Sequence, residues 1–208
     1  MSKFILRFFL STLLGTFFNG NDKNTIPKSA PKQAQITTFQ LHSGKRKFRW
    51  APNSIIDVIF CKKMKKYNSI GIHLLFYRWQ RHLKNKISLN FKGYKNKPSR
   101  GIFVCTDSIW NYPTHQKDVH AITLLMGYSG SSQILRSEIY LNTQKYNFRQ
   151  SVYSKFLLQS LILHEFGHAL GIIKHSINEH SIMHKHVNPY APFLHKEDIA
   201  RIKKLYQI

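Results

Sequence analysis

The sequence predicts one mixed α/β (α+β) domain, built from a twisted sheet of about five strands and from helices that pack against it. Its 208 residues suffice for a single hydrophobic core, and 42% of them are hydrophobic. Short apolar runs with the length of strands fill the middle of the chain, whereas longer amphipathic segments precede and follow them. An order of strand, helix, several strands and then helices is typical of this fold class.

The first 48 residues lack the pattern of a folded domain. Residues 1–19 begin with a lysine near the start and continue with an apolar run that only Arg7 interrupts. A bilayer crossing needs roughly 20 apolar residues, whereas a short apolar run after a positive start is typical of a secretory signal. We therefore expect a secreted or membrane-associated extracytoplasmic protein; an uncleaved anchor and an apolar helix packed on the domain are the alternatives. Residues 20–48 are polar and predict a linker or a short pro-segment.

The folded domain is expected to span residues 49–208. Residues 69–83 place apolar side chains at intervals of three and four, which predicts an amphipathic helix that Ser69 caps. Two further helices are expected at residues 151–170 and 196–206. Short apolar runs predict the strands, which are residues 54–61, 86–91, 101–106, 121–126 and 137–142.

The charge balance is strongly basic, because 32 Lys and Arg against nine Asp and Glu give a formal net charge of +23. Such a charge suits nucleic acids or membrane surfaces. The basic residues are scattered, however, with one dense run at residues 62–66, and no nucleic-acid-binding motif is present. We therefore expect non-specific binding to anionic surfaces and no specific nucleic-acid partner. No Asp-rich calcium loop can be drawn from the nine carboxylates, so calcium is not expected.

A histidine-containing motif ends the long predicted helix: His164-Glu165-Phe166-Gly167-His168. Positions i and i+4 lie one above the other on a helix face, so the two imidazoles can hold one metal ion. The carboxylate of Glu165, next to the first ligand, can then reach a water bound to that ion. Two nitrogen ligands with an adjacent base suit a metal-dependent hydrolase.

The residues after this motif complete the candidate site. Gly171 can adopt the positive φ that reverses the chain at a helix end. The chain then leads to His175, the expected third nitrogen ligand, and on to Met183 in an apolar turn. His180 and His184 are alternative third ligands. Three protein ligands leave a fourth position for water, which is the arrangement of a catalytic zinc.

At these residues the sequence resembles the metzincin metallopeptidases, and most closely their matrixin-like branch. The family pattern is His-Glu-x-x-His-x-x-Gly-x-x-His followed by a methionine turn. This chain departs from it in one respect, since its third histidine comes one residue late. The resemblance covers about residues 48–208. It includes Trp79 in the first helix, the strand at residues 138–142 and the C-terminal helix at residues 194–206.

The resemblance implies the metzincin fold and a zinc-dependent endopeptidase in which His164, His168 and His175 hold the ion. Glu165 would be the general base that takes a proton from the zinc-activated water, and Met183 would form a hydrophobic floor beneath the metal. The family fold also implies an edge strand that pairs with the main chain of a protein or peptide substrate. Its residues would be Ala121, Ile122, Thr123, Leu124 and Leu125.

A second, structural zinc of the kind that many matrixins carry is not expected. His115 and Asp118 stand in the right region. Thr123 and Tyr140, however, fall on strands where the family would need further histidines. The resemblance therefore implies one catalytic zinc ion.

The two cysteines, Cys61 and Cys105, are too few for a zinc-thiolate cluster. A single disulfide and two buried free thiols are both compatible with the sequence. The family sheet places the strands that begin near Ser54 and Gly101 side by side, which brings a bridge within reach.

Two other functions compete with the endopeptidase. One is a catalytically silent relative that keeps the fold for binding, against which the intact Glu165 argues. The other is a cationic, polyanion-binding protein whose histidines are incidental.

Overall fold

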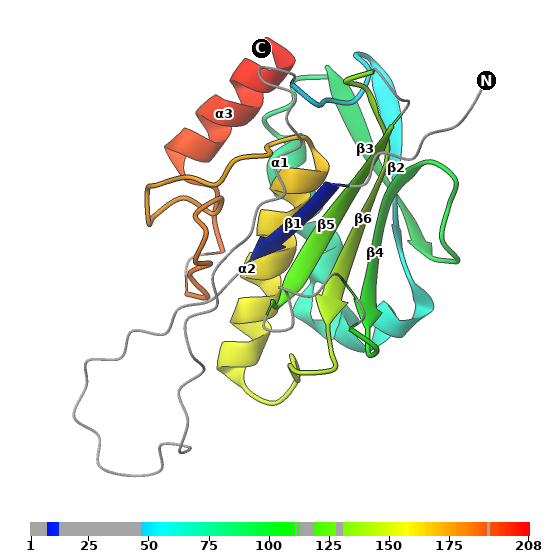
Figure 1. Ribbon diagram of the computed structural model, residues 1–208, viewed down its shortest axis with the longest axis vertical. Helices are drawn as coiled ribbons and strands as arrows, with labels where there is room; N and C mark the ends of the chain where they lie inside the picture. Colours follow the sequence, from blue (N-terminus) through cyan, green and yellow to red (C-terminus); the bar gives the residue numbers. More distant parts are fainter. Residues whose placement is uncertain (1–7, 13–46, 111, 113–118, 128–130, 191) are drawn as a thin grey trace.

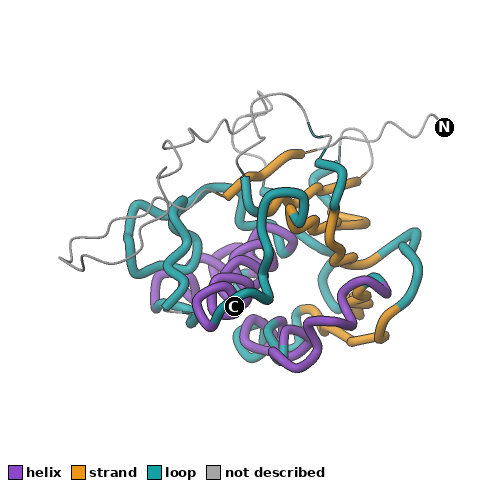
Figure 2. The backbone as a smooth tube through the Cα atoms, turned by 90° about the horizontal axis from the view of Figure 1, so that it is seen from below, coloured by secondary structure: helices purple, strands orange, loops and turns teal. Residues whose placement is uncertain are grey.

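The computed structural model describes residues 8–12, 47–110, 112, 119–127, 131–190 and 192–208. A twisted sheet packs on one face against the helices α1 (Phe76–Gln80) and α2 (Val152–Ala169), while α3 (Lys196–Tyr206) lies near the C-terminal end of α2 (Figure 1). Figure 2 shows the helices gathered on one side of the strands. The mixed α/β class predicted from the sequence is therefore confirmed.

The sheet has the strand order β1-β5-β6-β4-β2-β3. The contacts β2–β3, β2–β4 and β4–β6 are parallel, and β5 runs antiparallel to β6. Five strands lie where the sequence predicted them, namely β2 (Ser54–Phe60), β3 (Ile87–Tyr94), β4 (Gly101–Asp107), β5 (Ala121–Gly127) and β6 (Ile134–Asn142). The sixth, β1 (Phe8–Thr12), comes from the N-terminal segment and pairs antiparallel with the outer edge of β5.

The first predicted helix is wrong in its continuity. Residues 69–83 do not form one helix. They contain the end of the 3₁₀ helix η1 (Lys62–Ile70), the short 3₁₀ helix η2 (Ile72–Leu74) and α1. Gly71 separates the first two with a φ of 68°, a conformation that glycine adopts without steric cost. Ser69 therefore lies inside η1 and caps nothing. The apolar residues of the predicted face are nevertheless buried, because the short pieces keep them on one side: Ile72, Leu75, Phe76, Trp79 and Leu83.

The other two helices match their predicted bounds closely. Ser151 is the N-cap of α2, and its side chain accepts a hydrogen bond from the Ser154 N–H. The helix α3 begins after His195 with a capping box that the side chain of Asp198 completes. Both helices bear on the candidate site, because α2 carries the histidine motif near its C-terminal end and α3 packs beside that end.

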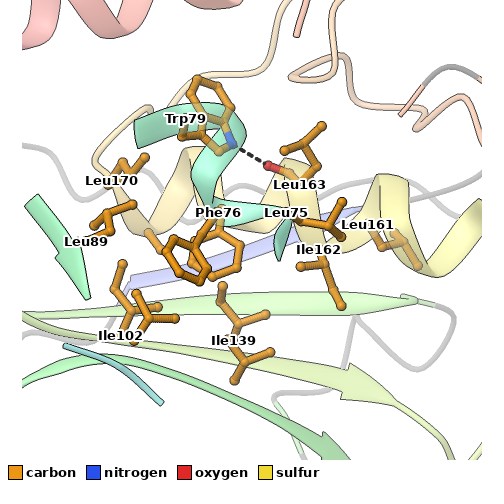
Figure 3. Close-up of a cluster of buried hydrophobic side chains, with 14 of the residues drawn as sticks. Leu75, Phe76, Trp79, Leu89, Ile102, Ile139, Leu161, Ile162, Leu163 and Leu170 are labelled. Atoms are coloured by element: carbon orange, nitrogen blue, oxygen red, sulfur yellow. Dashed lines mark hydrogen bonds between the residues drawn. The ribbon is translucent and has the colours of Figure 1, made fainter. Parts of the chain in front are cut away.

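The main core joins α1, α2 and the sheet. Trp79 is fully buried, and its Nε1 donates to the Leu163 carbonyl at 2.9 Å (Figure 3). The ring of Phe76 lies between the two helices and the strands, 6.1 Å from the ring of Phe166. These contacts fix the rotation of α2 about its axis and hence the direction of its histidines.

The two faces of β5 differ in what covers them. Ala121 and Leu125 belong to the main core beneath α2. The alternate residues face the opposite side of the sheet, where they form a second apolar cluster with Trp110 and Val119: Ile122, Leu124 and Met126. Thr123 lies on the inner face of β5, where its hydroxyl contacts α2.

A disulfide joins Cys61 to Cys105, with a Cα–Cα distance of 5.1 Å. It connects the end of β2 to β4. Of the two alternatives left open by the sequence, a disulfide and two buried free thiols, the structure shows the disulfide. Among the described residues, none of the helices has the length and apolar character needed to cross a bilayer.

Candidate active site

The last two turns of α2 carry His164 and His168. Both side chains are fully buried, and their ring centroids lie 4.6 Å apart. The spacing of four residues places both rings on the same face of the helix, as the sequence predicted. A helix is a rigid support, so local backbone geometry brings this pair together.

Backbone carbonyls orient both rings. His164 Nδ1 lies 2.6 Å from the Ile182 carbonyl oxygen, and His168 Nδ1 lies 2.5 Å from the Ile172 carbonyl oxygen. Because a carbonyl only accepts, each Nδ1 must carry the proton and donate it. Each Nε2 then has a free lone pair, and His164 Nε2 has no hydrogen-bond partner in the described structure. This is the tautomer that a metal ion requires.

The loop after α2 brings a third ring to the same point. His175 Nε2 lies 3.3 Å from His168 Nε2, and the three histidines present ligand atoms within 4.8 Å of one another. The alternatives lie elsewhere: His180 is exposed, and His184 directs its Nδ1 to the backbone of His186. The structure thus brings together the three residues that the sequence singled out, despite the additional residue before His175.

The chain reverses at Gly171, where φ is 105°. A Cβ at this position would overlap the Phe48 carbonyl oxygen, so only glycine fits both the backbone conformation and the space. Beyond it the loop is held by α3. Arg201 donates to the Lys174 carbonyl, and the hydroxyl of Ser176 donates to Glu197 Oε1 at 2.6 Å. These contacts on both sides of His175 hold the longer loop in place.

Met183 is fully buried, in a turn that packs on α2 at Gly167. Gly167 provides the space, because a Cβ there would overlap the Met183 sulfur. Asp198 of α3 holds the turn: its carboxylate accepts from the Ser181 hydroxyl and from the Ile182 N–H at 3.0 Å. Since the Ile182 carbonyl orients His164, this buried carboxylate is connected to the histidine cluster through the backbone of Ile182.

The C-terminal end of α2 is closed by side chains from three other elements. The Ala169 carbonyl accepts from Trp50 Nε1 at 2.9 Å and from Ser137 Oγ at 3.0 Å. The Leu170 carbonyl accepts from the Tyr206 hydroxyl at 2.9 Å. These bonds satisfy carbonyls that have no partner inside the helix, and they fix the turn that carries His168.

Electrostatics keeps the three rings neutral. Burial holds the pKa of His164 and His168 well below the ordinary histidine value, because a charged ring would lose its hydration. Burial also lowers the pKa of His175 to about 4, and the positive charge of Arg201 acts in the same direction. At pH 7 the site therefore offers three neutral imidazoles.

Glu165 lies between the two helical histidines in sequence and is fully buried. Its Oε2 accepts a hydrogen bond of 2.5 Å from the hydroxyl of Thr123 on β5. The same hydroxyl lies 3.3 Å from the main-chain oxygen of Glu165. The carboxylate thus faces the strand that the sequence singled out for substrate binding.

The structure adds to the sequence analysis at three positions. Gly167 stood in the motif without a role, and the two side-chain contacts of Asp198 and Thr123 were not foreseen. Asp198 lies in the first turn of the predicted C-terminal helix, where a capping carboxylate is common, and this gave a weak signal. No local pattern connects Thr123 to Glu165, which is 42 positions away. Of the residues considered for a second zinc, His115 and Asp118 lie outside the described part of the chain.

The donor set fits a zinc ion. The ligand atoms of the three histidines lie within 4.8 Å of one another, and three protein nitrogens are the number that a catalytic zinc takes, with a fourth position left for water. The orphaned His164 Nε2 is otherwise a buried polar atom without a partner among the described residues, which a metal ligand bond would satisfy.

Comparisons with known proteins place the chain in a family. Among solved structures, myroilysin is similar at 15% identity over 79% of this chain and 87% of that chain, with a TM-score of 0.42. Metalloproteinase-II from Bacteroides fragilis is similar at 12% identity over 77% of this chain and 55% of that chain, with a TM-score of 0.41. Archaemetzincin from Methanopyrus kandleri is similar at 10% identity over 81% of this chain and 100% of that chain, with a TM-score of 0.37. No curated protein matches in sequence. The matrixin family model matches residues 40–207, and the chain therefore belongs to the matrixin family.

Proposed function

We propose that this protein is a zinc-dependent endopeptidase. The observation that carries the proposal is the convergence of three neutral histidine rings, two of them oriented by backbone carbonyls, with the buried Glu165 next to His164 in the chain. Membership of the matrixin family supports the same activity. His164, His168 and His175 hold the ion, and Met183 forms the apolar floor of the site.

The residues of the chain divide the work of hydrolysis. Held by the three histidines, a zinc ion would supply Lewis acidity, which would polarise the peptide carbonyl and lower the pKa of a bound water toward ~7. Glu165 takes a proton from the attacking water and returns it to the departing amine nitrogen. The carbonyls of Ile182 and Ile172 keep His164 and His168 in the ligating tautomer throughout.

A peptide substrate binds along β5 by strand addition in this proposal. The strand β1 already pairs antiparallel with β5, in the register Phe8↔Leu125 to Thr12↔Ala121, so this edge accepts a strand. The edge is the one predicted for substrate, but β1 covers it. Substrate and β1 would therefore compete for the same backbone hydrogen bonds.

The decisive experiment combines metal analysis with a cleavage assay. Purified protein should contain one zinc per chain and should cleave casein until a chelator is added. Glu165→Ala should keep its zinc and lose about 10²–10⁴-fold in kcat, because the general base is gone. Glu179→Ala, which removes an exposed glutamate from the same region, should retain full activity.

Each failure has a separate meaning. One zinc per chain without cleavage would identify a catalytically silent relative, whereas absence of zinc would favour a polyanion-binding protein. A Glu165→Ala variant with full activity would show that another group is the base.

Trimming the N-terminus tests the substrate track. Removing residues 1–46, which include β1, should raise kcat/KM about tenfold if pairing of β1 with β5 is worth ~1.4 kcal/mol. A synthetic peptide of residues 4–16 should inhibit the trimmed protein, while a scrambled peptide should not. Equal activity of the full and trimmed chains would argue against competition at β5.

We also propose that the protein works outside the cytoplasm. The disulfide between Cys61 and Cys105 supports this, because such bonds persist in oxidising compartments. The apolar N-terminal segment is consistent with export, and detection of the disulfide-bonded protein in the culture medium tests it.

A further inference from the structure

Thr123 interrupts an apolar surface. On the inner face of β5 its neighbours, Ala121 and Leu125, both belong to the main core beneath α2. Thr123 itself is fully buried. A hydroxyl at such a place costs about 1–3 kcal/mol unless it finds a hydrogen-bond partner. Valine has the same shape and would avoid the cost, so the hydroxyl calls for an explanation.

The partner of this hydroxyl is the group proposed to move the proton. Thr123 Oγ1 donates to Glu165 Oε2 at 2.5 Å, across the interface between β5 and α2. Hydrogen bonds from a hydroxyl to a carboxylate are short and strong. Thr123 lies opposite Ile139 of β6 in the sheet, so the donor stands on a paired strand and not on a loop.

We infer that Thr123 is a positioning residue for Glu165: its hydroxyl holds one carboxylate oxygen, so that the carboxylate is presented to the attacking water in one orientation. The inference rests on the proposed peptidase activity. The same strand then has two tasks. The backbone edge of β5 receives the substrate, and the hydroxyl of Thr123 aligns Glu165, the base that acts on that substrate. The position of the scissile bond is thereby coupled to the position of the proton acceptor.

The kinetic test compares two substitutions in the zinc-loaded protein. Thr123→Val removes the hydroxyl and keeps the shape, and should lower kcat and kcat/KM together by about 10- to 100-fold. Thr123→Ser keeps the hydroxyl and should restore activity to near the wild-type level. Zinc content should stay at one ion per chain in both, because neither substitution touches a histidine. Thr123→Ala replaces the valine variant if that protein does not fold.

Thr143→Val provides a matched control. Thr143, next to the end of β6, donates a hydroxyl hydrogen bond of 3.0 Å to the Asp107 carbonyl at the end of β4. Its loss should lower thermal stability while leaving kcat unchanged. A kcat loss of the same size in both variants would show that Thr123 acts only through packing.

A binding experiment tests the inference without turnover. Acetohydroxamate chelates zinc and presents a proton to an acceptor beside the metal. We expect Glu165→Ala and Thr123→Val each to weaken its binding to the zinc-loaded protein, measured by calorimetry. In the Glu165→Ala background, Thr123→Val should have no further effect, because a residue that acts through the carboxylate has nothing left to orient.

The outcomes separate this inference from the proposed function. Absence of casein cleavage in the wild type would overturn the peptidase proposal, while the hydroxamate cycle would still test the coupling. The positioning role is overturned if Thr123→Val matches the wild type in kcat and hydroxamate affinity, if Thr123→Ser is as impaired as Thr123→Val, or if the two substitutions weaken hydroxamate binding independently.

Discussion

The helical pair His164 and His168 and the loop residue His175 reach the same point by different means. The pair stands on one rigid helix, fully buried, with each ring held by a backbone carbonyl. His175 follows a glycine turn and is partly exposed. Its loop depends on contacts with α3, through Arg201 and Glu197.

This difference separates local from tertiary control of a candidate metal site. Two ligands are specified by a spacing of four residues, which any helix converts into proximity. The position of His175 is specified by the contacts of its loop with α3. The number of residues before His175 can therefore change while its ring keeps the same position. The longer connection between Gly171 and His175 therefore does not disrupt the site.

Removing the ligands one at a time should have the largest effect. Alanine at His164, His168 or His175 should weaken zinc binding by more than the 10- to 100-fold typical of outer partners. The metal-free proteins should differ, because His164→Ala leaves a cavity at a fully buried position and costs about 2–5 kcal/mol of unfolding free energy. His175→Ala should cost less than ~1 kcal/mol.

Zinc titration against a chromophoric chelator and urea unfolding of the metal-free proteins measure the two quantities. Equal destabilisation by His164→Ala and His175→Ala would remove the distinction between helix and loop.

The support of the loop should have an intermediate effect. Glu197→Ala removes the acceptor of the Ser176 hydroxyl and should weaken zinc binding about tenfold. Glu179→Ala removes the same charge from an exposed position and should leave the affinity unchanged. In a His175→Ala background the Glu197 substitution should have no further effect. A loss that persists there would mean that Glu197 acts on the helical pair instead.

The smallest expected effect is a dependence of metal-free stability on pH. The folded pKa of His175 is lowered to about 4, so below pH 6.5 the unfolded chain binds a proton that the folded chain does not. Stability from this group is complete above pH 6.5 and falls as the pH falls toward 4. At pH 5.5 the wild type should have lost about 1 kcal/mol more than His175→Ala, relative to pH 7. Urea unfolding at both pH values tests this, and parallel curves would contradict it.

Sequence reasoning succeeded where local pattern decides the outcome. The five strands, α2 and α3 follow from runs of apolar residues, and the positive φ at Gly171 follows from the need to end a helix. It failed at residues 69–83, because apolar spacing shows which side chains are buried but not whether Gly71 breaks the helix.

The features that the sequence did not predict are contacts between distant segments. Pairing of β1 with β5 depends on backbone hydrogen bonds that carry no side-chain pattern. The bond from Thr123 to Glu165 joins a strand to a helix, and each residue has an ordinary local role without it. Geometry across the fold, which spacing alone does not encode, decides both.

The closure of α2 by Trp50 and Tyr206 has a consequence for how the protein matures in the cell. These residues are 156 positions apart, yet the Trp50 N–H lies 3.3 Å from the Tyr206 hydroxyl, and both side chains hold carbonyls at the end of the same helix. The helix end beside His168 can be closed only after both residues have been synthesised, so the candidate metal site is completed late in the folding of this domain.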